Sequence, residues 1–153
     1  MIRKRKSGLD DGAIIRLIRQ ELVPLTPPEL QDRSVTDREL LRRIGRGTTF
    51  VWSSSVDVRA SGFVSTIRQG DVLLVDLLAT APRHRRKGIG TALLKKAEHH
   101  AWALGCSGLQ LYVNNGNEAA IRFYEKNGLR RAWYEPGLDS IVMRKAIRPG
   151  TYM

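Results

Sequence analysis

The sequence predicts a single α/β (α+β) domain over residues 1–153, built around a strand, a basic glycine loop, a helix and a second strand. A chain of 153 residues with 42% hydrophobic residues is long enough to bury one core. Residues 72–80 form a nearly continuous apolar run, typical of a strand covered on both faces. Apolar residues recur at helical spacing over 88–104, and an alternating strand pattern follows at 109–113. A crossover of this length makes the two strands parallel.

The first elements are a strand and a helix. Residues 1–6 form a candidate edge strand, and Asp10 or Asp11 can cap a helix that runs through Val23. The prolines within residues 23–34 remove amide donors and restrict the residues before them. We therefore expect a loop there, with about one turn of helix.

The remaining elements follow from caps and hydrophobic spacing. Thr36 and Glu39 form a capping box at the start of a short helix that ends at Gly45 or Gly47. A helix over 117–128 closes at Gly128 in the left-handed conformation. Besides the two strands of the crossover, strands are expected at 48–54, 62–68, 130–135 and 140–147, the last two as a hairpin around 136–139.

The net charge of +11 suggests an anionic partner without naming it. Residues 82–100 hold six Lys or Arg and only one acidic residue, Glu98. The rest of the excess positive charge is scattered along the chain, which argues against a continuous basic surface for nucleic acid.

The single cysteine, Cys106, permits no internal disulfide and no multi-cysteine metal site, so a reducing cytoplasm is expected. We expect no membrane span, because no apolar stretch approaches about 20 residues.

The segment RHRRKGIG, residues 83–90, combines cationic side chains with two glycines at the start of the crossover helix. Helix starts offer unpaired amide groups and about half a positive charge, and Gly88 and Gly90 remove side chains that would keep an anion away. The loop is therefore predicted to hold phosphate. A dinucleotide fingerprint fails because Leu93 replaces its third glycine, and the P-loop pattern is missing.

Two motifs resemble a known family. RRKGIG, residues 85–90, matches the R-x-x-G-x-G/A acetyl-CoA signature of the GNAT superfamily of N-acetyltransferases, with Pro82 before it as in many members. A second GNAT motif, N-x-x-A-x-x-x-Y-x-x-x-G-[FL], is matched by Asn117, Ala120, Tyr124, Gly128 and Leu129. The order of elements also resembles the family along nearly the whole chain.

The resemblance implies a mixed, mostly antiparallel sheet of six to seven strands with about four helices, whose parallel pair splays apart to admit the cofactor. It implies an acetyl-CoA-dependent N-acetyltransferase, without a metal, that acetylates a primary amine of a small molecule, protein or peptide directly in a ternary complex. The implied cofactor-binding residues are Leu78, Ala79, Thr80, Arg85, Arg86, Lys87, Gly88, Ile89, Gly90, Thr91, Asn117 and Tyr124. Thr80 departs from the small hydrophobic residue common there, and Asn117 can equally act as a helix N-cap.

Two residues are candidates for proton transfer. Tyr124, by similarity, is the general acid at the sulfur, and an ordinary tyrosine pKa of about 10 keeps it protonated; without the motif it would be taken as a core residue. Asp76 interrupts an apolar strand, where desolvation would raise its pKa toward that of a base. It could instead hydrogen-bond a loop or pair with an arginine, leaving water to accept the proton.

The acceptor is not identified. In the family it is set by the loop after the first helix and by the final strands, here 24–34 and 132–140. Glu29, Asp32, Glu135 and Asp139 could attract a cationic amine or simply be solvated.

Two other functional classes stay open: a non-catalytic CoA-binding regulatory module, and a basic nucleic-acid-associated protein on the same fold. A homodimer is also left open. His84 is expected to be a solvated loop residue or a minor phosphate neighbour.

Overall fold

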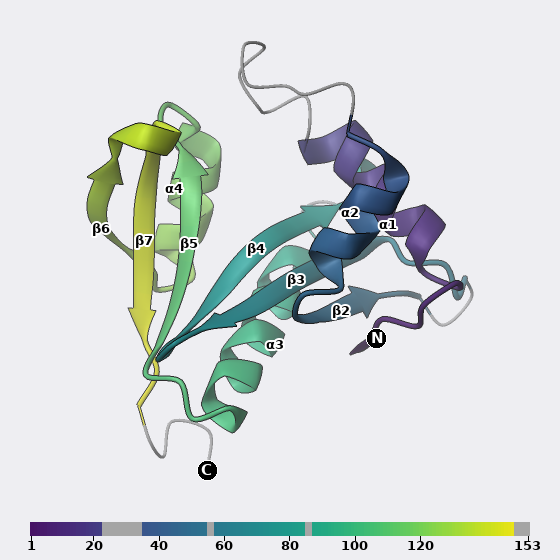
Figure 1. Cartoon of the computed structure of the whole chain (residues 1–153), viewed down its shortest axis with the longest axis horizontal. Helices are drawn as coiled ribbons and strands as arrows, with labels where there is room; N and C mark the ends of the chain where they lie inside the picture. The colour runs from purple at the N-terminus through teal and green to yellow at the C-terminus, as the bar shows by residue number, and fades with distance from the viewer. Residues whose placement is uncertain (23–34, 55–56, 85–86, 149–153) are drawn as a thin grey trace. The chain divides into compact units, whose positions relative to one another are not determined.

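The computed structural model describes residues 1–22, 35–54, 57–84 and 87–148, which form seven strands and four α-helices (Figure 1). The loop expected over 23–34 lies outside these residues. The strands are β1 (Ile2–Lys4), β2 (Thr48–Trp52), β3 (Gly62–Gln69), β4 (Val72–Thr80), β5 (Gly108–Asn114), β6 (Arg130–Glu135) and β7 (Ser140–Ala146). The helices are α1 (Asp11–Leu17), its π-helical continuation η1 (Ile18–Leu22), α2 (Asp37–Ile44), the 3₁₀ turn η4 (Pro82–His84), α3 (Ile89–Ala103), α4 (Glu118–Lys126) and the 3₁₀ turn η5 (Pro136–Leu138).

The strand order confirms the predicted mixed sheet. It is β1-β2-β3-β4-β5-β7-β6, with antiparallel pairing of β1 with β2, β2 with β3, β5 with β7 and β6 with β7. The predicted parallel pair is β4 with β5, in which Val72–Leu74 pair with Gly108–Gln110. This ladder occupies only the start of each strand, since β4 continues to Thr80 and β5 to Asn114.

The chain divides into two compact units. Unit 1 comprises Met1–Ile67 and Leu77–Lys96, and unit 2 comprises Arg68–Asp76 and Ala97–Met153. Strands β3 and β4 and helix α3 each run from one unit into the other. A single domain over 1–153 stays a prediction.

The core of unit 1 lies between its helices and strands β2–β4. Ile14 and Ile44, from α1 and α2, are fully buried together with Val51 and Phe63 from β2 and β3. Apolar burial of this kind is the main favourable contribution to folding. The predicted Thr36 cap of α2 is confirmed, because its hydroxyl accepts a hydrogen bond from the Glu39 amide at 3.2 Å.

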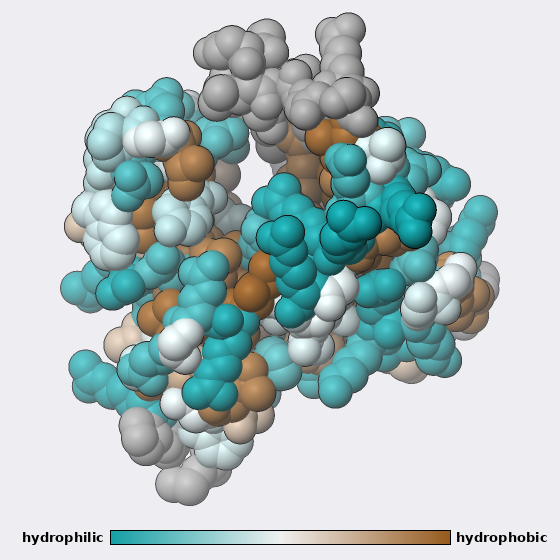
Figure 2. Space-filling model, in the orientation of Figure 1, coloured by the Kyte–Doolittle hydropathy of each residue, from teal (hydrophilic) through white to brown (hydrophobic). Residues whose placement is uncertain are grey.

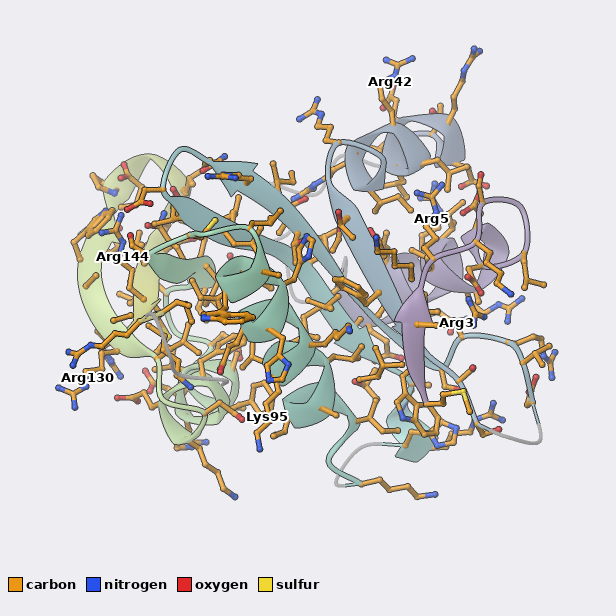
Figure 3. All side chains as sticks on the ribbon, turned by 90° about the horizontal axis from the view of Figure 1, so that it is seen from below. Arg3, Arg5, Arg42, Lys95, Arg130 and Arg144 are labelled. Atoms are coloured by element: carbon orange, nitrogen blue, oxygen red, sulfur yellow. The ribbon has the colours of Figure 1, made fainter. Side chains whose placement is uncertain are left out.

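The expected side-chain cap of α1 by Asp10 is wrong. Asp10 occupies the N-cap position but makes no side-chain cap hydrogen bond. Its buried carboxylate instead accepts from both terminal nitrogens of Arg3, at 2.7 and 2.9 Å, and from the Lys6 amide at 2.7 Å (Figure 3). A buried charge is stable only when it is paired and hydrogen-bonded. The Asp10 carboxylate therefore binds the Arg3 guanidinium of β1 and not the first amides of α1.

A glycine permits close packing between β2 and β3. A Cβ atom at Gly47 would overlap the carbonyl oxygen of Thr66. Gly47 precedes β2, and Thr66 pairs with Thr48 at the start of that strand. Residue 47 therefore lacks a side chain because a backbone group occupies its place.

Unit 2 is a sheet of β5, β7 and β6 preceded by the start of β4. In its register Leu111 pairs with Met143, and both side chains are buried. Edge strand β6 is largely exposed and carries a register shift between Arg131 and Trp133. Figure 1 shows α4 behind β5 and β7.

Hydrophilic residues cover much of the face seen in Figure 2, with hydrophobic residues between them. Among the helices of the described residues, none is long and apolar enough to cross a bilayer.

Gly47→Ala should lower the free energy of unfolding by about 1–3 kcal/mol, because the added methyl group must displace backbone. The matched control is Gly12→Ala in α1, where a Cβ would meet no atom within 4 Å, and alanine favours a helix by about 0.5–1 kcal/mol. Urea unfolding of both variants measures the difference. Equal free energies of unfolding for the two variants would contradict the steric overlap expected at residue 47.

Asp10→Asn should lower the free energy of unfolding at pH 7 by about 1–3 kcal/mol, since it leaves Arg3 without its anion. The pKa of Asp10 lies below its ordinary 3.8, because the hydrogen bonds from Arg3 and Lys6 outweigh the desolvation that would raise it. Its contribution is therefore present above about pH 4 and is lost as the pH falls through the folded-state value. The difference between the variant and the wild type should shrink toward pH 3 in urea unfolding, unlike that of the exposed control Asp37→Asn.

Candidate active site

The predicted phosphate loop of unit 1 ends at a helix start. Gly88 has φ +76, in the left-handed region, and its carbonyl accepts from the Ala92 amide at 2.9 Å, the first hydrogen bond of α3. The amides of the first helical turn have no acceptor within the helix and carry partial positive charge. A Cβ at Gly88 would meet nothing within 4 Å, so the backbone there faces open space. Such a helix start suits an anion.

Buried contacts fix the direction of this helix start. Ile89 and Leu93 are buried, and their side chains approach the backbone of Gly62 at the beginning of β3. A Cβ at Gly62 would lie 3.2 Å from the Ala79 carbonyl oxygen and 3.2 Å from Leu93 Cδ1. Glycine at 62 therefore lets α3 and the end of β4 approach the same point of β3.

His84 differs from the expected solvated loop residue. It is half-buried, and its ring centroid lies 5.5 Å from that of Trp52 at the end of β2. The pKa of His84 lies below its ordinary value because of burial, and the positive charges of Arg83 and Lys87 act in the same direction. Its Nδ1 is buried without a hydrogen-bond partner, the only such side-chain atom found among the described residues. A buried polar nitrogen without a protein partner is available to bind a ligand at this loop.

In unit 2 the second motif forms α4. Asn117 caps it, because its side-chain oxygen accepts from the Ala120 amide at 3.3 Å. The half-buried Tyr124 lies in the last turns, with its ring 5.2 Å from that of Phe123 in an edge-to-face arrangement. Burial raises the pKa of Tyr124 to about 12. Its hydroxyl therefore keeps its proton throughout the physiological range.

A partly buried ion pair holds the end of α4. Lys145 Nζ donates to Glu98 Oε1 at 2.9 Å and to the Asn127 carbonyl at 3.1 Å. Glu98 is almost completely buried, whereas the Lys145 side chain is 31% exposed, so the pair is partly open to solvent. The motif glycine, Gly128, has φ +92 as predicted, and a Cβ there would lie 3.0 Å from Lys145 Nζ. The helix that carries Tyr124 is thus tied to β7 and α3, through residues that the sequence pattern did not single out.

Asp76 and α4, the helix that carries Tyr124, lie on opposite faces of the unit 2 sheet. Side chains alternate along a strand, so Asp76 shares a face with Leu74, which pairs with Gln110. On that face Arg144 Nε donates to Gln110 Oε1 at 2.6 Å. The next residue, Lys145, points to the other face, where it contacts the end of α4. Asp76 itself is half-buried, so the expected desolvation of its carboxyl group is only partial.

The final hairpin contains Asp139, one of the carboxylates that could attract a cationic acceptor amine. Asp139 has φ +44, an uncommon conformation for a residue other than glycine, and accepts from the Tyr134 hydroxyl at 2.7 Å. Asn115 Nδ2 donates to the same oxygen at 3.3 Å. Glu29 and Asp32 lie outside the described residues.

The predicted site residues fall in both units. Leu78, Ala79, Thr80, Lys87, Gly88, Ile89, Gly90 and Thr91 belong to unit 1, and Asp76, Asn117 and Tyr124 to unit 2. Arg85 and Arg86 lie outside the described residues. Within the part of the chain that the structure describes, no group of three His, Cys, Asp or Glu residues could hold a metal ion.

Comparison with known sequences places this arrangement among acetyltransferases. The model of the acetyltransferase (GNAT) family matches residues 15–129. The chain is 31% identical over 144 residues to thialysine N-epsilon-acetyltransferase of Bos taurus, covering 84% of this chain and 82% of that protein. It is 34% identical over 80 residues to streptothricin acetyltransferase of Streptomyces lavendulae, covering 52% and 40% respectively.

A solved structure has the same fold. The PaiA N-acetyltransferase of Thermoplasma acidophilum in complex with coenzyme A has a TM-score of 0.78 at 22% identity, over 95% of this chain and 99% of that chain.

Proposed function

The chain belongs to the GNAT family of acetyltransferases and is an acetyl-CoA-dependent N-acetyltransferase, and we propose that it passes the acetyl group directly to a small primary amine within a ternary complex. The observation that carries this proposal is the glycine-opened start of α3, which directly follows β4 and η4. The mostly antiparallel sheet with its parallel β4–β5 pair is the family fold.

The residues at this helix start fit a pyrophosphate. The backbone at Gly88 is open, the first amides of α3 lack intrahelical acceptors, and His84 Nδ1 lacks a partner. We propose that residues 85–91 hold the pyrophosphate largely through backbone amides, with Asn117 as a further contact. Leu78, Ala79 and Thr80 would bind the pantetheine arm as an added strand, since the β4–β5 ladder comprises only Val72–Leu74 of β4. Acetyl-CoA supplies the thioester whose acetyl group is transferred.

Tyr124 is proposed to donate a hydrogen bond to the departing sulfur. Its pKa of about 12 ensures that the proton is present, but it also makes the phenol a weak acid. Relative to a thiol pKa of about 8.5, transfer of the phenol proton to the departed thiolate would be uphill by roughly 5 kcal/mol. We infer that Tyr124 acts mainly by donating a hydrogen bond to the charge that develops on the sulfur.

The acceptor amine must lose a proton, because an alkyl ammonium group with a pKa near 10 is only about 0.1% neutral at pH 7. We propose that Asp76 accepts this proton directly or through water. Its position on the sheet face opposite α4 supports this role, because it separates the proposed base from the proposed proton donor on α4. Water alone remains the alternative acceptor.

The proposed acceptor class is a small-molecule amine. Its support is the match to thialysine N-epsilon-acetyltransferase along most of both chains, together with the shorter match to streptothricin acetyltransferase. A reducing cytoplasmic location is part of the proposal, since the one cysteine, Cys106, is free and buried. Coenzyme A release measured across a panel of amines, with lysine analogues among them, tests the class. Turnover confined to peptides and protein N-termini would contradict it.

Tyr124→Phe should lower kcat by about 10²–10⁴-fold while leaving coenzyme A affinity within about twofold, because it removes only the donor hydroxyl. Coenzyme A release and calorimetric binding measure the two quantities. Tyr112→Phe, on the exposed part of β5, is the matched control. Unchanged turnover in Tyr124→Phe would remove the proposed donor.

Asp76→Asn should lower kcat/KM for the amine by about 10–100-fold at pH 7, where the amine is protonated. The deficit should shrink toward pH 10, because the neutral amine needs no base. The pH profile of kcat/KM makes the measurement, with Asp37→Asn as the control. A deficit independent of pH, or none at all, would leave water as the acceptor.

A further inference from the structure

A hollow of about 440 Å³ opens in unit 1. Its described lining contains none of the residues proposed to bind acetyl-CoA, although Arg83 is the first residue of the predicted phosphate loop. Its walls come from α1 and η1, from the residues just before β3, and from the residues just after β4. The volume falls within the range of small-molecule pockets, roughly 300–1,000 Å³. Leu17 and Ala60 are buried and give it an apolar base.

The polar part of the lining is cationic. Arg16, Arg59 and Arg83 line the hollow together with the Gln20 amide, and no aspartate or glutamate is among the described lining residues. Guanidinium groups bind carboxylates and phosphates through paired N–H donors. The three arginines come from segments far apart in the sequence, and only Arg83 belongs to a motif that the sequence analysis singled out.

One of the three charges is already compensated. Arg59 binds Asp57 through two hydrogen bonds, from Nε to Oδ1 at 3.1 Å and from Nη2 to Oδ2 at 3.0 Å. These bonds lower the pKa of Asp57, and the charge of Arg83 lowers it further, which indicates that Arg83 also lies near this carboxylate. Neither Arg16 nor Arg83 has a hydrogen bond or ion pair to another described residue. The hollow therefore keeps an excess of positive charge.

We propose that this hollow binds the carboxylate or phosphate group of a small organic ligand other than the acetyl donor. Arg16 and Arg83 bind the anion from two sides, and the apolar base takes the ligand's carbon skeleton. The site gives part of the +11 net charge a role beyond the pyrophosphate loop. The proposal does not depend on the transfer reaction, because it rests on the cavity and its charges alone.

The test uses the whole chain saturated with coenzyme A, so that the pyrophosphate loop is filled, and inorganic phosphate as the calorimetric probe. The double variant Arg16→Ala/Arg83→Ala should bind phosphate at least about tenfold more weakly than the wild type. The control is Arg42→Ala/Arg68→Ala, which removes the same charge at exposed positions outside the lining; Figure 3 shows Arg42 projecting outward from α2. Thermal unfolding without phosphate verifies that both double variants fold.

Equal weakening in the two double variants would overturn the proposal, because net charge alone would then explain binding. It would also be overturned if the Arg16→Ala/Arg83→Ala variant lost affinity only for coenzyme A and not for dephospho-coenzyme A, since the anion would then be the donor's own 3′-phosphate. Competition of phosphate with lysine and with 1,5-diaminopentane, which lacks the carboxylate, identifies the source. If lysine displaces phosphate and 1,5-diaminopentane does not, the site binds the carboxylate of an amine acceptor. If neither compound displaces phosphate, the site binds a separate phosphate ligand. Both results support the site.

Discussion

The first backbone amides of α3 have no hydrogen-bond acceptor within their own helix. The residues around this helix start leave the amides accessible and hold the helix in place. Glycine at 88 turns the chain in the left-handed conformation and leaves these amides open to the outside. Glycine at 62 lets the buried Ile89 and Leu93 approach the β3 backbone, so the helix start is held by packing and not by charge. An anion is the partner that completes such a helix start.

The two residues proposed to move protons belong to opposite faces of the unit 2 sheet. Asp76 points to one face of β4, and Lys145 ties the helix of Tyr124 to the other. Lys145 binds both Glu98 and the Asn127 carbonyl, and these bonds hold the end of the helix that carries Tyr124. Burial gives Tyr124 a high pKa, which favours hydrogen-bond donation over proton transfer.

Positive charge serves different purposes in different places. On β1, Arg3 forms an ion pair with the buried Asp10, and this pair stabilises the fold. On β7, Arg144 lies 4.9 Å from the ring of Trp133 and binds Gln110. Around the hollow of unit 1, Arg59 pairs with Asp57, whereas Arg16 and Arg83 are available to the anion proposed to bind there.

The sequence by itself determined the elements, the parallel crossover, the Thr36 cap, the glycine-opened helix start and the family, because each depends on local spacing or on a contiguous motif. The tertiary structure alone decided that Asp10 binds Arg3 and leaves α1 without its cap, and that His84 packs on Trp52. It also decided that Lys145 holds α4 and that three distant arginines meet in one hollow. The physical reason is that most of these contacts join segments far apart in the chain, and the partner of a buried charge such as Asp10 is selected only once the chain has folded.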